Sequence, residues 1–205
     1  MTAARESALE SVHQEVNRCT RCPLHQGRTK AVPGSGPFDP EIIFIGEAPG
    51  FHEDQQGVPF VGRAGQFLNE LLEKVGIDRQ RVYITNVIKC RPPANRDPRE
   101  DEVQACKEYL DRQIELLQPR VIVTLGRHSM ARAFPNEKIS AVHGQPRSVE
   151  GQVYFPMYHP AAALHQPSLR PLVEADFEKL RELLDGKLRA TPYAPPPDVE
   201  QLSFF

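Results

Sequence analysis

Apolar residues along the chain occur in short runs and in longer stripes, and the two patterns alternate. The run at residues 42–45 ends at Gly46 and is typical of a buried strand. Residues 82–87, Val121–Leu125 and residues 153–158 have the same character. We therefore predict four short strands that are covered on both faces.

Between these runs, apolar residues recur every three or four positions, which predicts amphipathic helices. One helix is expected between Gly65 and Gly76, a short one over residues 127–134, and a last one over residues 172–184. The first of these helices presents an apolar face made of Phe67, Leu68, Leu71, Leu72 and Val75.

The longest helix is predicted to begin near residue 97 and to stop before Pro119. Asp97 is expected as the N-cap, Pro98 at the first helical position, and Glu100 as the capping glutamate. Its apolar stripe consists of Val103, Cys106, Leu110, Ile114 and Leu117.

Strands separated by helices predict an α/β fold, a four-stranded parallel sheet sandwiched between helices. Such sheets bind ligands in the loops at the carboxyl ends of their strands. This rule directs attention to the segments after Gly46, Asn86 and Tyr158.

The 205 residues are the length of one domain, and the composition changes only near the end. We expect one folded domain over residues 1–190. Residues 191–205 contain four prolines and read as a stiff linker that stays outside the core, followed by an apolar tail from Gln201 to Phe205.

A net charge of -2 does not mark the chain as a bulk nucleic-acid binder. A local basic cluster suits transient contact with phosphates, although a solvated loop would look the same. The cluster consists of Lys89, Arg91, Arg96 and Arg99, with Arg79 and Arg81 upstream.

The mean hydropathy is -0.47, and every apolar run is too short to cross a bilayer. The polar N-terminal segment also lacks the apolar core of a signal peptide. We therefore expect a cytoplasmic protein with no membrane partner, and a monomer.

The four cysteines are better explained by a metal than by disulfides, because a cytoplasmic protein keeps its thiols reduced. A thioredoxin-type pair would follow a strand, which the first two cysteines do not. Cys106 alone would pass as a core residue, since it lies on an apolar stripe. A zinc ion and an iron–sulfur cluster both accept the set Cys19, Cys22, Cys90 and Cys106.

Chemistry-bearing residues follow three of the predicted strands. The loop Gly46-Glu47-Ala48-Pro49-Gly50 leads on to the carboxylates Glu53 and Asp54, while Asn86 ends the second strand and His159 follows the fourth. Each feature alone has a bland explanation, a surface turn or a structural histidine. Because all of them belong to one edge of one sheet, we expect them to share a site.

Taken together, these segments resemble the family-4 uracil-DNA glycosylases. The resemblance rests on GEAPG with the ED and PFVGRAG that follow, on ITNVIKCRPP, on HPAAAL and on the order of the cysteines. It implies removal of uracil from DNA in base excision repair and a 4Fe-4S cluster held by Cys19, Cys22, Cys90 and Cys106.

The resemblance also implies roles for individual residues. The enzyme would flip a nucleotide out of the duplex, Phe60 would stack on the uracil, and Asn86 would read its O4 and N3 edge. His159 would stabilise the charge that develops at O2. Leu164 would be the apolar wedge in the DNA, or would simply pack the loop.

The water-activating group is open. Better-known uracil glycosylases have an aspartate at the position of Ala48, a pocket residue in this chain, so Glu47 or Glu53 would take over the role, and Glu47 is favoured. No basic insertion interrupts residues 87–97, which argues against the variant that traps its product on a histidine.

The last five residues, Gln201-Leu202-Ser203-Phe204-Phe205, resemble the bacterial sliding-clamp-binding pentapeptide. Three other functions fit parts of the sequence: a glycosylase that also accepts hypoxanthine or xanthine, a metal-stabilised DNA-binding module without catalysis, and a redox protein. Purine substrates would test the first, and a failure to form abasic sites would favour the second.

Overall fold

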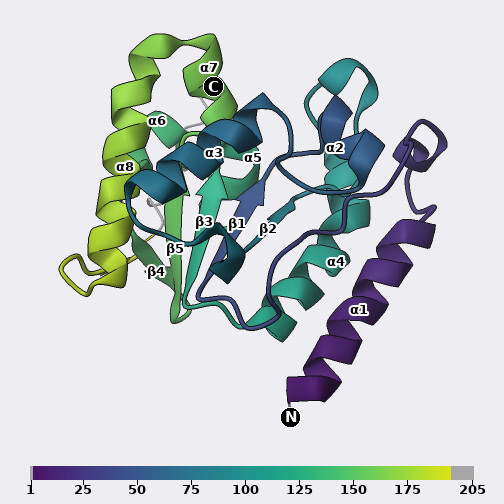
Figure 1. Ribbon diagram of the computed structural model, residues 1–205, viewed down its shortest axis with the longest axis horizontal. Coiled ribbons are helices and arrows are strands. Elements are labelled where there is room, and N and C mark those ends of the chain that lie inside the picture. Colours follow the sequence, from purple (N-terminus) through teal and green to yellow (C-terminus); the bar gives the residue numbers. More distant parts are fainter. Residues whose placement is uncertain (1, 195–205) are drawn as a thin grey trace, which may run out of the picture.

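A sheet of six strands forms the centre of the protein in the computed structural model, which describes residues 2–194 (Figure 1). The strands lie in the order β2-β1-β3-β5-β4-β6. Their bounds are Ile42–Gly46 for β1, Val82–Asn86 for β2, Val121–Leu125 for β3, Arg147–Val149 for β4, Gln152–Met157 for β5 and Thr191–Pro192 for β6.

The predicted four-stranded parallel sheet is confirmed as β2, β1, β3 and β5, all of which pair in parallel. The sequence did not reveal β4, which pairs antiparallel to β5 through a tight turn. Glu150 (φ 49°) and Gly151 (φ 84°) both adopt the left-handed conformation there, as the turns that join adjacent antiparallel strands require.

The first residues of the predicted linker, from Thr191, contact the sheet and its neighbours. Thr191 and Pro192 form β6 beside β4, and the Tyr193 ring packs edge-on against Phe134 at 4.8 Å between ring centroids. The first linker residues therefore belong to the folded domain. The predicted clamp-binding tail from Gln201 to Phe205 lies outside the described residues.

Helices cover both faces of the sheet (Figure 1). The α-helices are α1 Thr2–Arg18, α2 Phe51–Gln56, α3 Arg63–Lys74, α4 Glu100–Leu117, α5 Arg127–Met130, α6 Ile139–Val142, α7 Pro160–His165 and α8 Arg170–Leu184. Single turns of 3₁₀ helix are η1 Pro23–Gln26, η2 Arg79–Arg81, η3 Pro93–Asn95 and η4 Pro167–Leu169.

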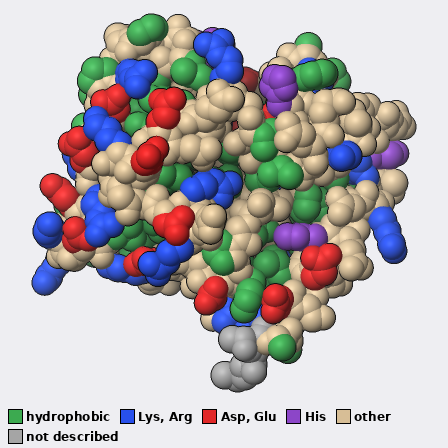
Figure 2. Space-filling model, viewed as in Figure 1, with side chains coloured by type: hydrophobic (Ala, Val, Ile, Leu, Met, Phe, Trp, Pro, Cys, Tyr) green, Lys and Arg blue, Asp and Glu red, His purple; other side chains and the backbone are tan. Residues whose placement is uncertain are grey.

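Alternation along the strands divides the core between the two faces. Ile42 and Phe44 of β1 face the apolar sides of α3 and α8, and the Phe44 ring stacks on Phe177. Ile43 and Ile45 face α4 instead. Figure 2 shows the outer surfaces of α3 and α8, where acidic and basic side chains are interleaved.

Two helix starts differ from the prediction. The residue that caps α4 is Arg99, and the Glu102 carboxylate closes this start by accepting the Arg99 backbone N–H at 2.8 Å, so the predicted cap at Asp97 with Glu100 is wrong. Polar α1 was not predicted at all. It packs on α4 through Val12 and Val16. These two residues have helical spacing, but most residues around them are polar, so the apolar face of the helix is hard to recognise in the sequence.

In the part of the chain that the structure describes, no helix combines the length and the apolar character needed to cross a membrane.

Candidate active site at the carboxyl ends of the strands

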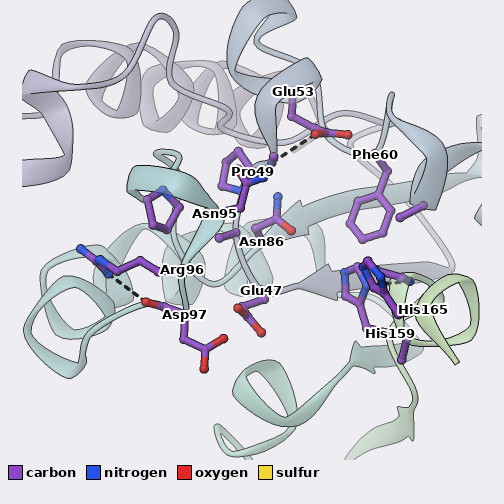
Figure 3. Close-up of a pocket in the computed structure, with 16 residues that line it drawn as sticks. Glu47, Pro49, Glu53, Phe60, Asn86, Asn95, Arg96, Asp97, His159 and His165 are labelled. Carbon is purple, nitrogen blue, oxygen red and sulfur yellow. Dashed lines mark hydrogen bonds between the residues drawn. The ribbon is translucent and has the colours of Figure 1, made fainter.

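A pocket of about 590 Å³ opens at the carboxyl ends of β1, β2 and β5. Side chains from all three loops point into it (Figure 3). The structure therefore brings these three loops together around one pocket. The pocket is lined by Glu47, Ala48, Pro49, Gly50, Glu53, Phe60, Ala64, Asn86, Pro92, Asn95, Arg96, Asp97, His159, Ala161, Ala162 and His165.

Asn86 is placed by the register of two strands, which pairs it directly with Gly46. A Cβ atom on Gly46 would overlap the Asn86 side-chain oxygen and would lie 2.8 Å from two carbons of the Phe60 ring. Only glycine therefore fits at this position. Asn86 is 1% exposed, and its Oδ1 accepts no hydrogen bond, so a buried acceptor faces the pocket without a donor.

Phe60 forms the apolar wall of the pocket. Its backbone adopts φ 55°, a conformation that is uncommon for a bulky residue. The conformation depends on Gly65 of α3, because any Cβ there would collide with the Phe60 carbonyl group. The Phe60 ring lies 5.4 Å from the His159 ring, at 29° between the planes.

His159 caps the start of α7, and this contact determines where its proton resides. Its Nδ1 accepts the Ala161 backbone N–H at 3.1 Å, so Nδ1 carries no hydrogen and Nε2 carries the proton in the neutral ring. Burial lowers the pKa of His159 to about 4, while the charge of Glu53 acts in the opposite direction. The ring is therefore neutral near pH 7 and offers one N–H donor.

Glu53 is occupied with the loop that follows β1. Its carboxylate accepts backbone N–H groups from Gly50 at 3.1 Å, Val61 at 2.9 Å and Gly62 at 2.8 Å. Asp54 is buried and accepts the Thr29 N–H at 2.9 Å. These contacts favour a role for both carboxylates in shaping the loop, and leave Glu47 as the freer candidate for activating water.

Glu47 lies half-buried at the other side of the pocket (Figure 3). Burial raises the pKa of Glu47, the charges of His128 and Arg127 lower it, and Asp97 raises it. His128 Nε2 lies 3.7 Å from a Glu47 oxygen and 3.9 Å from an Asp97 oxygen. Ligand atoms of all three side chains lie within 4.8 Å of one another, and Arg127 forms an ion pair with Asp97 beside them.

Sequence reasoning missed several of these residues. His128 lies just after β3, so the rule about strand ends applied to it as well, but no motif marked the position. Asn95, Asp97 and His165 also line the pocket. Their loops come close only in the folded chain.

Leu164 does not line the pocket. It is half-buried and packs against the hydrophobic core beneath α7, while the exposed His165 next to it forms part of the pocket wall. The structure therefore gives the packing role for Leu164 direct support, and the wedge role stays a prediction.

Only some members of the predicted basic cluster lie at the protein surface. Lys89 is 1% exposed, so its inclusion was wrong. Arg96 forms an ion pair with Glu102 at 2.5 Å, and the Arg91 guanidinium lies 5.1 Å from the centre of the Phe51 ring. Arg91, Arg96 and Arg99 line a groove that adjoins the pocket and shares Pro92 and Arg96 with it.

The four cysteines line a single small cavity between α1, η1 and α4 and are all free thiols. Three cationic side chains, Arg21, Arg28 and Lys89, line the same cavity, and Arg28 Nη1 lies 3.2 Å from the Cys90 sulfur. Burial raises the pKa of Cys106 to about 11, and the backbone N–H and charge of Lys89 counteract this effect. Four converging sulfurs with nearby positive charge fit a metal centre that binds thiolates.

The chain is similar in sequence to known proteins over most of its length. The sequence model of the family described as "Uracil DNA glycosylase superfamily" matches residues 33–185. The chain is 50% identical over 188 residues to the type-4 uracil-DNA glycosylase of Sulfurisphaera tokodaii, covering 86% of this chain and 84% of the relative. The type-4 enzymes of Archaeoglobus fulgidus and Thermotoga maritima are 46% and 45% identical, over 88% of this chain in each case and over 95% and 96% of the relatives.

The protonation of His159 can be measured directly. We expect NMR titration of its ring to give a pKa near 4, because burial disfavours the charged ring. The unfolded chain binds this proton near pH 6.5, so the contribution of His159 to stability is complete above that pH and is lost as the pH falls toward 4.

His159→Gln should remove this part of the pH dependence of the unfolding free energy, whereas His165→Gln, at an exposed position, should leave it in place. Titration of the His159 ring near pH 6.5 would contradict the structure of the pocket.

Proposed function

The chain belongs to the uracil DNA glycosylase superfamily, and we propose that it hydrolyses the N-glycosidic bond of deoxyuridine in DNA, leaving an abasic site. The observation that carries this proposal is the buried, unpaired Oδ1 of Asn86, which faces a pocket bounded by an aromatic ring and a neutral histidine. A flipped-out pyrimidine meets all three groups at once.

Asn86 reads the edge of the base. Its Oδ1 accepts the uracil N3–H, and its side-chain N–H donates to O4. Cytosine presents an acceptor at N3 and a donor at C4, so it leaves both Asn86 groups facing a like partner. Phe60 stacks on the ring of the base, and Ala48 lines the pocket, where it leaves room for the base.

His159 acts on the departing base. As the glycosidic bond breaks, the sugar becomes cationic in character and negative charge develops on uracil O2. The Nε2–H of neutral His159 donates to that oxygen and stabilises the charge, an effect of about 2.7–4 kcal/mol for a comparable buried donor.

Glu47 holds the attacking water, whose oxygen bonds to C1′ of the sugar as the C1′–N1 bond breaks; the proton that this water loses passes to the Glu47 carboxylate and, in the net reaction, to the departing uracil anion. Its place across the pocket from Glu53 and its contact with His128 support this role. Because bond breaking leads in this reaction, Glu47 mainly orients the water and contributes less than His159. Glu53 contributes by holding the loop that carries Phe60.

The surroundings of the pocket suit DNA. Arg91, Arg96 and Arg99 supply positive charge in the adjoining groove, where phosphates on one side of the flipped nucleotide can bind. Leu164 becomes the wedge that fills the base stack only if α7 exposes it when DNA binds, since its side chain packs on the core in the free protein.

Cys19, Cys22, Cys90 and Cys106 hold a 4Fe-4S cluster in the cavity that they line. When bound, the cluster cross-links α1, the segment after β2, and α4, so its contribution is structural. The all-cysteine ligand set and the cationic surroundings support this assignment.

The tail from Gln201 to Phe205 docks on a sliding clamp. The support is its sequence alone, a glutamine and apolar anchors at the end of a proline-rich segment.

Uracil excision should depend on the two groups that touch the base. The purified protein should form alkali-labile sites in uracil-containing oligonucleotides without magnesium. His159→Ala should slow single-turnover excision by about 100-fold to 1000-fold. Asn86→Leu should cost at least about 100-fold, because it removes donor and acceptor at similar volume.

Lys138→Ala, at an exposed site, should keep the full rate. Duplexes with hypoxanthine or xanthine, assayed in parallel, give the substrate range. The proposal fails if the wild-type protein forms no abasic sites or if both pocket variants keep their rate.

Iron content tests the cluster. Protein purified without oxygen should be brown and contain about four iron and about four sulfide ions per chain. Cys90→Ser should lose iron and unfold at a lower temperature, whereas Thr20→Ser, between two of the ligands, should keep both properties. Bound zinc, or no metal, would contradict the assignment.

Truncation tests the tail. A chain that ends at residue 200 should excise uracil from oligonucleotides at the full rate but no longer bind a bacterial sliding clamp. A chain whose last five residues are shuffled serves as the matched control and should also fail to bind. If the truncated chain binds the clamp as tightly as the full-length chain does, the tail is not the clamp-binding segment.

A further inference from the structure

Lys89 is a buried cation that neither the base pocket nor the cysteine set explains. It lies three residues after Asn86 and one before Cys90, and its side chain is 1% exposed. Its ammonium group donates to Thr85 Oγ1 at 2.6 Å, to the Asn86 carbonyl at 2.9 Å and to Gln113 Oε1 at 2.7 Å. All three of its hydrogens are therefore used.

These acceptors belong to a wider buried network. Thr85 Oγ1 donates to the Pro33 carbonyl at 2.8 Å, and Gln113 donates to the same carbonyl at 2.8 Å and to the Tyr83 hydroxyl at 3.1 Å. The Tyr83 hydroxyl in turn shares a hydrogen bond of 2.7 Å with His13 of α1. Through Lys89, the strand end that carries Asn86 is connected to both α1 and α4.

The charge of Lys89 has no carboxylate partner. Among the described residues, no acidic side chain forms an ion pair with its ammonium group. A buried charge that lacks an opposite charge is strongly unfavourable, and burial accordingly lowers the pKa of Lys89 to about 7, whereas the charge of Cys106 raises it. The groups near it that can become anionic are the cysteines, because Lys89 lines the cavity that all four of them share.

We propose that Lys89 is a positioning residue shared by the two sites: it fixes the end of β2 that presents Asn86, and it supplies the positive charge that the thiolate-bound cluster needs. The charge role rests on the proposed cluster, and the positioning role rests on the proposed reading of uracil by Asn86. Neither role requires Lys89 to touch the substrate.

Two measurements on the intact, cluster-loaded protein test the two roles. Lys89→Met keeps the length of the side chain and removes its charge. A positive charge near a cluster favours the reduced state, so the midpoint potential of the cluster should shift to a lower value in this variant. The single-turnover rate constant for uracil excision, measured at saturating enzyme, should fall at least tenfold, because the end of β2 loses its support.

Gln113→Leu separates the roles. It keeps the Lys89 charge but removes one of its three acceptors, so excision should fall several-fold while the midpoint potential stays near that of the wild type. Lys107→Met is the matched control: Lys107 follows Cys106 directly, but its side chain is exposed and paired with Asp111. This variant should change neither the potential nor the rate.

A wild-type potential and rate in Lys89→Met would overturn the proposal. If Lys89→Met does not accumulate as folded protein, Gln113→Leu decides, and an unchanged rate in that variant would overturn the positioning role. A wild-type protein that holds no iron would overturn the cluster and with it the charge role. A wild-type protein that holds iron but does not excise uracil would overturn the proposed reaction instead.

Discussion

The register between β1 and β2 is the constraint on which the pocket depends. It sets Gly46 opposite Asn86, and because a glycine has no Cβ, the Asn86 amide and the Phe60 ring can both lie over that position. A slip by one residue would turn Asn86 to the other face of the sheet. The apolar pairs Ile42–Val82 and Phe44–Ile84, buried beneath α3 and α8, oppose such a slip. The core thereby holds the chemistry in place.

The polar side chains of the pocket differ in whether their hydrogen-bonding groups are already used within the protein. His159 is kept neutral by burial and has a donor aimed at the pocket, while Asn86 Oδ1 is an acceptor that the protein leaves open. The Glu53 carboxylate, by contrast, already accepts three backbone N–H groups of its own loop, and these contacts fix it there. Which carboxylate is free for chemistry is thus decided by hydrogen bonding.

Much of the fold could be predicted because its signals are local. The four parallel strands, the stripes of α3 and α8, and the end of α4 before Pro119 follow from spacing and from helix-breaking residues. The start of α4 could not be predicted, because Glu100 and Glu102 can both act as the capping glutamate, and Arg96, which pairs with Glu102, favours the later one. Helix α1 was missed because only its few buried positions on α4 are apolar.

For the site, the order of motifs along the chain was enough to predict which residues follow the parallel strands, and hence that Glu47, Asn86 and His159 belong to one edge of the sheet. Three features became visible only in the folded chain: His128 contacts Glu47, Leu164 packs inward, and Lys89 is buried between the pocket and the cysteines. Strand order and helix period depend on neighbouring residues, so they can be read along the chain. Burial and hydrogen bonding depend on groups 24 to 80 positions apart, as the contacts of Gln113 with Lys89 and Pro33 illustrate, and only folding brings such groups together.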